Sequence, residues 1–165
     1  MQYISSDTNV WIDFSLISSI HLPFLIPYTY IMHNDAIEDE LLSPQGIAGA
    51  LKDAGLVGVD LTIEEFFLAD SFGPKYPRLS IYDRVALAIA KERGLTLLTG
   101  DMALRKAAIE ENVPIMGTIG ILDQLFENGH ITKEEYKDCL ESLQSLNGEE
   151  VRLPAKELAK RLQDL

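Results

Sequence analysis

The fold is decided by an apolar run that passes directly into polar residues, Leu95-Thr96-Leu97-Leu98-Thr99-Gly100-Asp101. This run predicts a short buried strand over residues 95–98. A helix is expected from Asp101 to about Asn112, because Asp is a favoured residue at helix N-caps. A strand that leads directly into a helix is typical of a parallel sheet, where helices connect the strands.

The same alternation extends in both directions along the chain. We expect further strands over Gln2 to Ser6, Phe24 to Ile26, Leu56 to Val59 and Val113 to Met116. We expect further helices over Val10 to about Ile20, Asp35 to Leu42, Ile47 to Ala54, Thr62 to about Phe72, Ser80 to Arg93 and Ile119 to Glu127. Strands separated by helices at this spacing predict an α/β protein with a central parallel sheet and helices on both faces.

The last part of the chain is expected to be helical. Thr132 and Glu135 form a capping-box pattern for a helix to about Leu146, and Pro154 stands where a final helix would begin. We therefore expect an α/β domain over residues 1–130 and a helical extension over residues 131–165 packed on it. A single cysteine, Cys139, excludes an internal disulfide and is interpreted as a packing residue on a helix.

The charge is unevenly distributed. The chain has 14 basic and 26 acidic residues, a net charge of -12, which argues against nonspecific wrapping of nucleic acid. Residues 1–70 carry a net charge of -10 with Lys52 as their single base, residues 71–122 carry +2, and residues 123–165 carry -4. A polyanion is therefore expected to approach over residues 71–122. We find no apolar run of membrane-spanning length and no signal-peptide pattern, so we expect a soluble cytoplasmic protein.

Four carboxylates are predicted to meet at one edge of the sheet, because ligands bind beyond the carboxyl ends of parallel strands. Asp7 follows the first strand and Asp101 follows residues 95–98. Asp83 lies in the first turn of the helix that leads into that strand, and Glu40 lies in the helix after the second expected strand. Such like charges raise one another's pKa unless a cation lies between them. Oxygen ligands of this kind favour Mg²⁺ or Mn²⁺ over Zn²⁺.

Each acid also has a simpler interpretation. Asp7, Asp83 and Asp101 fit helix caps, and Glu40 fits a solvent-exposed helix face. Three cap-type acids at one edge nevertheless favour a site, since caps alone do not require that arrangement. Zinc chemistry is disfavoured because the histidines, His21, His33 and His130, have no zinc-site spacing. Trp11 and Phe14, at helical spacing, are interpreted as core residues.

Four segments resemble, in order, the acidic motifs of the PIN-domain nucleases: residues 6–13, 36–41, 80–90 and 97–106. Residues 116–122 and the helical tail are similar to a prokaryotic branch of that family related to the toxins of VapBC toxin-antitoxin pairs. The resemblance implies a three-layer α/β/α sandwich and a Mg²⁺- or Mn²⁺-dependent endoribonuclease. It also implies a homodimer and, for a toxin, a small inhibitory antitoxin.

The resemblance assigns roles residue by residue. The catalytic and metal-binding acids are Asp7, Glu40, Asp83 and Asp101, with Asn9 and Thr99 as polar neighbours. Glu38 is the alternative to Glu40 in the second motif. The expected mechanism is metal-assisted hydrolysis, in which the ion polarises a phosphoryl oxygen and lowers the pKa of the attacking water. Three basic residues close to these acids are the candidate RNA phosphate anchors: Arg84, Arg105 and Lys106.

Two other function classes are weighed against this one. The first is a catalytically weak or inactive PIN-like module that acts by protein-protein binding, with the acidic N-terminal half meeting a basic partner. The second is a receiver-type α/β domain. It requires a lysine at a later strand end, and none follows residues 113–116.

Overall fold

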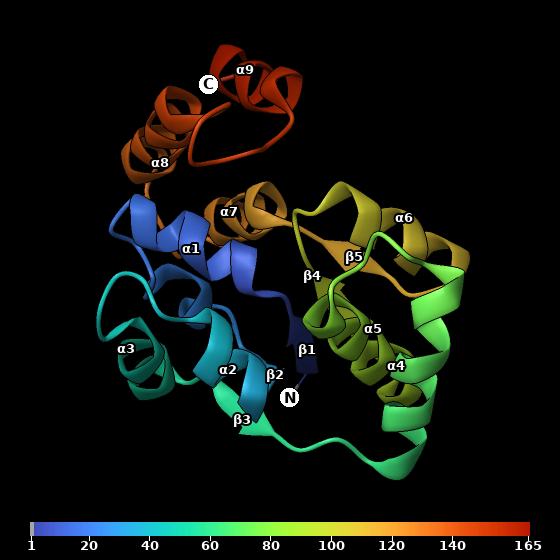
Figure 1. Cartoon of the computed structure of the whole chain (residues 1–165). Coiled ribbons are helices and arrows are strands. Elements are labelled where there is room, and N and C mark those ends of the chain that lie inside the picture. The colour runs from blue at the N-terminus through green and yellow to red at the C-terminus, as the bar shows by residue number, and fades with distance from the viewer. Residues whose placement is uncertain (1) are drawn as a thin grey trace.

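A parallel sheet lies at the centre of the computed structural model, which describes residues 2–165 (Figure 1). Its strands are β1 (Gln2–Ser6), β2 (Tyr28–His33), β3 (Val57–Val59), β4 (Thr96–Leu98) and β5 (Ile115–Met116). Their order in the sheet is β3-β2-β1-β4-β5, and every neighbouring pair is parallel. The carboxyl ends of the neighbouring strands β1 and β4 therefore lie side by side.

Helices cover both faces of this sheet, because successive strand residues point to opposite sides. Ile31 and Leu97 pack into an apolar cluster with α4 (Ile63–Lys75), α5 (Ile81–Arg93) and α6 (Met102–Glu110). Tyr30 and Leu98, each next in sequence to one of these, pack into a second cluster on the other face. The helices of that second cluster include α1 (Thr8–Leu16), α2 (Asn34–Glu40), α3 (Ile47–Ala54) and α7 (Thr118–Glu127). The expected three-layer α/β/α sandwich is confirmed.

The C-terminal helices α8 (Lys133–Leu146) and α9 (Ala155–Gln163) stack beyond α1 and α7 (Figure 1). Leu140, Leu143 and Leu158 are fully buried in the same apolar cluster as α7. Cys139 is buried in α8, as the sequence predicts. Within residues 2–165, none of the helices combines the length and the apolar character that crossing a bilayer demands.

The second strand lies later in the chain than predicted. Residues 24–26 are not a strand: Leu22–Leu25 form the short 3-10 helix η1, with Pro23 in its first turn. The strand is instead Tyr28–His33, which begins directly after Pro27. Its central residues Tyr30, Ile31 and Met32 are all buried, so the run lacks the alternation of a half-exposed strand. This correction places His33, rather than Ile26, at the carboxyl end of the strand.

Two helix ends also differ from the prediction. The first helix ends at Leu16 rather than near Ile20, because Ser18 adopts a left-handed conformation with φ of 54°. The helix predicted to stop at Phe72 continues to Lys75 with Pro74 in its last turn. A proline there removes one backbone hydrogen bond near the end of the helix. The capping box predicted at Thr132 and Glu135 is present, and capping boxes also begin α4 at Thr62 and α5 at Ser80.

Glu111 ties α4, α5 and the end of α6 together from a buried position. Its carboxylate accepts hydrogen bonds from Lys75 at 2.5 Å, from Lys91 at 2.6 Å and from the hydroxyl of Tyr76. Burial alone raises the pKa of Glu111, but these donors outweigh it and hold the pKa at about 2. The ionised carboxylate therefore stabilises the fold from neutral pH down into the acid range.

We predict that Glu111→Gln lowers the free energy of unfolding by about 2 kcal/mol at pH 7, because it weakens hydrogen bonds to a charged group. A folded-state pKa below the unfolded value gives stability that is present above about pH 4.5 and is lost as pH falls toward 2. Urea unfolding at pH 7 and pH 3 measures the difference. Glu92→Gln, at an exposed position on α5 beside Lys91, is the control, and an equal loss in both variants would contradict the prediction.

Candidate active site

The site begins at Asp7, the residue that follows β1. Asp7 is 5% exposed and its backbone N–H donates to the Leu98 carbonyl of β4 at 2.9 Å. One carboxylate oxygen accepts the Thr8 backbone N–H at 2.7 Å, and the other accepts the buried hydroxyl of Thr99 at 2.9 Å. Asp7 is therefore bound to both central strands, and Thr99 lies in direct contact with it as expected. Asn9, the other expected polar neighbour, is exposed on α1 and makes no hydrogen bond to Asp7 within residues 2–165.

Asp101 is the N-cap of α6 and Asp83 belongs to the capping box of α5, and each uses one carboxylate oxygen in this role. Asp83 Oδ2 accepts the Ser80 backbone N–H at 3.0 Å in the capping box of α5. Asp101 Oδ1 accepts the Leu104 backbone N–H at 2.9 Å at the start of α6. Within residues 2–165, Asp83 Oδ1 and Asp101 Oδ2 have no hydrogen-bond donor. The cap interpretation and the ligand interpretation are thus compatible for both residues.

Glu40 joins the site from α2. Its Oε1 accepts the Thr8 hydroxyl at 2.7 Å, one residue from Asp7. Glu38, the sequence alternative, is exposed and has no such contact. The geometry therefore favours Glu40 as the acid that α2 supplies.

His33 is a residue of this region that the sequence interpretation missed. Asp7, Glu40 and His33 line a small cavity of about 10 Å³, room for about one water molecule. His33 Nδ1 is buried with no hydrogen-bond partner within residues 2–165 and lies 3.9 Å from an oxygen of Asp35. Ser5 of β1 pairs with Ile31 of β2. Two residues further along the chain from each of these, Asp7 therefore lies level with His33. A strand assigned to residues 28–33 would have revealed this pairing.

The carboxylates influence one another electrostatically. Burial, followed by the charge of Asp83 and more weakly that of Glu40, raises the pKa of Asp7 to about 7, although the Thr99 and Thr8 hydrogen bonds oppose this rise. The pKa of Asp83 is also raised, first by burial and further by Asp101. The four predicted acids thus lie in one electrostatic neighbourhood. Among residues 2–165, however, no three His, Cys, Asp or Glu side chains are close enough to enclose a metal ion directly.

The three candidate phosphate anchors differ in their availability. The Arg84 guanidinium packs toward α4, where a Cβ at Gly73 would lie 3.2 Å from Nη1. Arg105 donates one N–H to the Thr99 carbonyl at 2.9 Å, so it holds the loop that carries Asp101. Lys106 is exposed and makes no hydrogen bond or ion pair within residues 2–165. Of the three, Lys106 has the charge most available to a ligand.

We predict that Asp7→Asn stabilises the metal-free protein at pH 8 and leaves its stability unchanged near pH 3.5. The folded-state pKa of Asp7 is raised from 3.8 to about 7, so the folded protein binds a proton that the unfolded chain releases as pH rises between these values. Above pH 7 this costs about 4 kcal/mol, which the uncharged Asn avoids.

Urea unfolding in a chelating buffer at the two pH values measures this difference. Asp53→Asn, at an exposed position on α3, is the matched control and should shift neither value. A stabilisation by Asp7→Asn that is the same at both pH values would show that ionisation of Asp7 is not its cause.

Comparison with known proteins agrees with the geometry. A protein-family model described as a PIN domain matches residues 4–165. No curated protein and no solved structure matches the chain. PIN domains are typically nucleases and generally use divalent metals. The family match covers nearly the whole chain, from β1 through α9, and includes all four acids at the carboxyl edge of the sheet. The chain belongs to the PIN-domain family.

Proposed function

We propose that this protein is a divalent-metal-dependent endoribonuclease that hydrolyses RNA phosphodiester bonds at Asp7, Glu40, Asp83 and Asp101. The observation that carries the proposal is the burial of the Asp7 carboxylate beside two further acids. Burial and the charges of Asp83 and Glu40 raise its pKa to about 7. A cation at this edge would remove the repulsion, and that stabilisation is a physical reason for acids to gather there.

The donor set fits Mg²⁺ or Mn²⁺. All four side chains offer carboxylate oxygens, which hard divalent cations prefer. Mg²⁺ usually keeps several waters and binds through one or two carboxylates, so it does not require a direct cage of three side chains. The oxygens of Asp83 and Asp101 that have no donor are suited to bind the ion directly or through its waters.

Residues of the chain position the acids around such an ion. A bound divalent ion supplies Lewis acidity and a water of lowered pKa. Thr8 and Thr99 hold Asp7 in one orientation, and Thr8 also fixes Glu40. The second oxygen of Glu40 has no donor within residues 2–165, so it would be free to accept a hydrogen bond from a water held by the ion.

The finer biological role follows from the resemblance to the VapBC toxins. On that basis the proposal extends to a cytoplasmic toxin that forms a homodimer and is inhibited by a small antitoxin. Ile63, Phe66 and Phe67 are exposed on α4 and are an apolar surface that a second copy would cover. The alternative, a binding module without catalysis, is favoured by the net charge of -10 over residues 1–70, which suits a basic partner.

We predict that Mn²⁺ both activates and stabilises the protein. Cleavage of single-stranded RNA should require the ion, and Mn²⁺ at 100 times its dissociation constant should add about 2.7 kcal/mol to the free energy of unfolding. Asp101→Asn should abolish cleavage yet keep the fold, because Asn still caps α6 but is a weaker cation ligand. Gel assays and thermal denaturation with and without Mn²⁺ provide the measurements.

Asp53→Asn serves again as the control and should cleave like the unmodified protein. Retained specific activity in Asp101→Asn would remove that residue from the mechanism. Absence of cleavage and of any Mn²⁺-dependent stabilisation in the unmodified protein would favour the binding module.

We further predict that RNA binding depends on Lys106 and not on Lys52. Both are exposed lysines, on α6 and α3 respectively. Screened Coulomb attraction acts over about 10 Å at 0.1 M salt, so a phosphate responds to nearby charges more than to the net charge. In an Asp101→Asn background, Lys106→Ala should reduce the slope of log affinity against log salt by roughly 0.7, and Lys52→Ala should not. Equal slopes in a fluorescence anisotropy titration would exclude Lys106 from the RNA path.

A further inference from the structure

A large cavity lies beside the carboxylate site and is not explained by it. Its volume is about 850 Å³, within the range of small-molecule binding sites. It is bounded by Gly100 before α6, by residues 115–120 at the junction of β5 and α7, and by residues 147–148 and 152–154 between α8 and α9. Ile115, Met116, Ile119 and Leu153 make its wall largely apolar. A ligand that fills this cavity would need a large apolar surface to match its wall.

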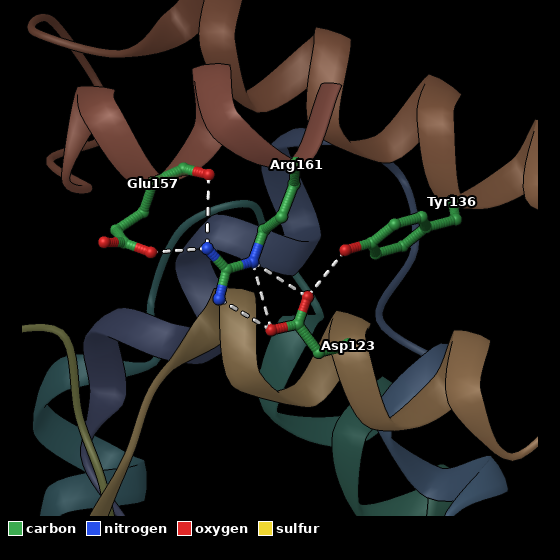
Figure 2. A network of polar contacts seen from close by, with 4 residues as sticks. All are labelled: Asp123, Tyr136, Glu157 and Arg161. Carbon is green, nitrogen blue, oxygen red and sulfur yellow. Dashed lines mark hydrogen bonds and ion pairs between the residues drawn. The ribbon is translucent and has the colours of Figure 1, made fainter. Parts of the chain in front are cut away.

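The helical tail forms one wall of the cavity and is fixed in place by an ion-pair network. Arg161 of α9 donates to both oxygens of Asp123 on α7 at 2.9–3.1 Å, and it also contacts Glu157 (Figure 2). Tyr136 of α8 donates to the same Asp123 at 2.6 Å. Arg161 and Glu157 line the cavity. Because Asp123 and Glu157 neutralise Arg161, its charge is not available to a ligand.

Two other arginines of the lining keep free donors. Arg152 is exposed and makes no hydrogen bond or ion pair with any residue in the described range 2–165. Arg105 uses one of its five N–H donors on the Thr99 carbonyl. Glycine at position 117 allows this placement, because a Cβ there would lie 2.8 Å from Arg105 Nη1. The lining therefore combines an apolar wall with two guanidinium groups that have free donors, those of Arg105 and Arg152. They form a local positive region in a protein whose net charge is -12.

The cavity is also connected to the acids. Gly100 lines it and is followed directly by Asp101. Arg105 reaches the site through Thr99, whose carbonyl accepts from Arg105 and whose hydroxyl donates to Asp7. A ligand in the cavity and a phosphate at the carboxylates are therefore separated by one short loop.

We propose that this cavity is a nucleoside subsite, which takes the base and ribose next to the scissile phosphate of single-stranded RNA. The proposal rests on the proposed nuclease function. The apolar wall packs against the base, and Arg105 and Arg152 bind a flanking phosphate. A base held in a duplex is stacked on its neighbours and cannot enter, so the cavity selects single strands. A basic protein segment fits less well, because the two arginines repel it.

The test uses adenosine 5′-monophosphate as the probe, added without metal to ¹⁵N-labelled full-length protein. We expect shifts in the amide signals of Gly100 and Gly117, with an affinity at least tenfold above that for inorganic phosphate or adenosine alone. Arg152→Ala should weaken binding of the nucleotide about tenfold and leave binding of adenosine unchanged. Lys160→Ala, an exposed cation of α9 outside the lining, is the matched control and should bind as the unmodified protein does.

A second variant fills the cavity. The φ of Gly100 lies outside the left-handed range, and a Cβ there would meet Leu153 Cδ2 at 4.0 Å, an ordinary contact. The backbone and Cβ of Gly100→Leu are therefore accommodated, and the variant should fold, with a cooperative thermal transition as the check, and lose the nucleotide-induced shift at Gly117. Normal nucleotide binding in Gly100→Leu or in Arg152→Ala would overturn the proposal. Equal affinities for the nucleotide and for phosphate would also overturn it.

The subsite and the nuclease function can fail separately. Nucleotide binding in the cavity without any Mn²⁺-dependent cleavage would retain the subsite and overturn the nuclease. Mn²⁺-dependent cleavage with no amide shifts at Gly100 or Gly117, and with the same KM in Arg152→Ala, would retain the nuclease and overturn the subsite.

Discussion

The site depends on how the Asp7 carboxylate is held between the two central strands. Its backbone N–H extends the pairing of β1 with β4, and the hydroxyl of Thr99, just after β4, donates to its side chain. Thr8 then donates its backbone N–H to Asp7 and its hydroxyl to Glu40. One buried acid thereby fixes the relative positions of β1, β4 and α2. The energetic cost is a raised pKa, since burial and the neighbouring acids penalise the charged form.

Features that depend on interactions between residues close in sequence were predictable from the sequence. The capping box at Thr132 and the direct passage from β4 to Asp101 depend on a few adjacent residues, and the structure shows both. The parallel sheet followed from the alternation of such segments. The position of Asp7 and Asp101 at the same edge follows from topology, because β1 and β4 are neighbours in the sheet. Local signals and one topological rule were sufficient for this part of the site.

The remaining features depend on contacts that sequence spacing does not encode. The strand β2 is buried on both faces and lacks an alternating pattern, so residues 28–33 were missed and His33 was not placed beside Asp7. The large cavity needs the loop between α8 and α9 to return to the start of α7. That return is fixed by Arg161 and Asp123, which are 38 residues apart. Arg152 joins Arg105 only through this long-range packing.

The charge available to a ligand also differs from the charge counted along the chain. Residues 71–122 carry seven basic side chains, yet Lys75 and Lys91 bind Glu111, and Arg93 binds Glu65. These cations are committed to packing α4, α5 and α6 together, so their fields are largely neutralised locally. A polyanion would therefore meet few free cations, and among them are Lys106 on α6 and Arg152 beyond the segment that the charge count favoured. In an acidic protein, the path of a polyanion is determined by which cations lack an internal partner rather than by where cations are most frequent.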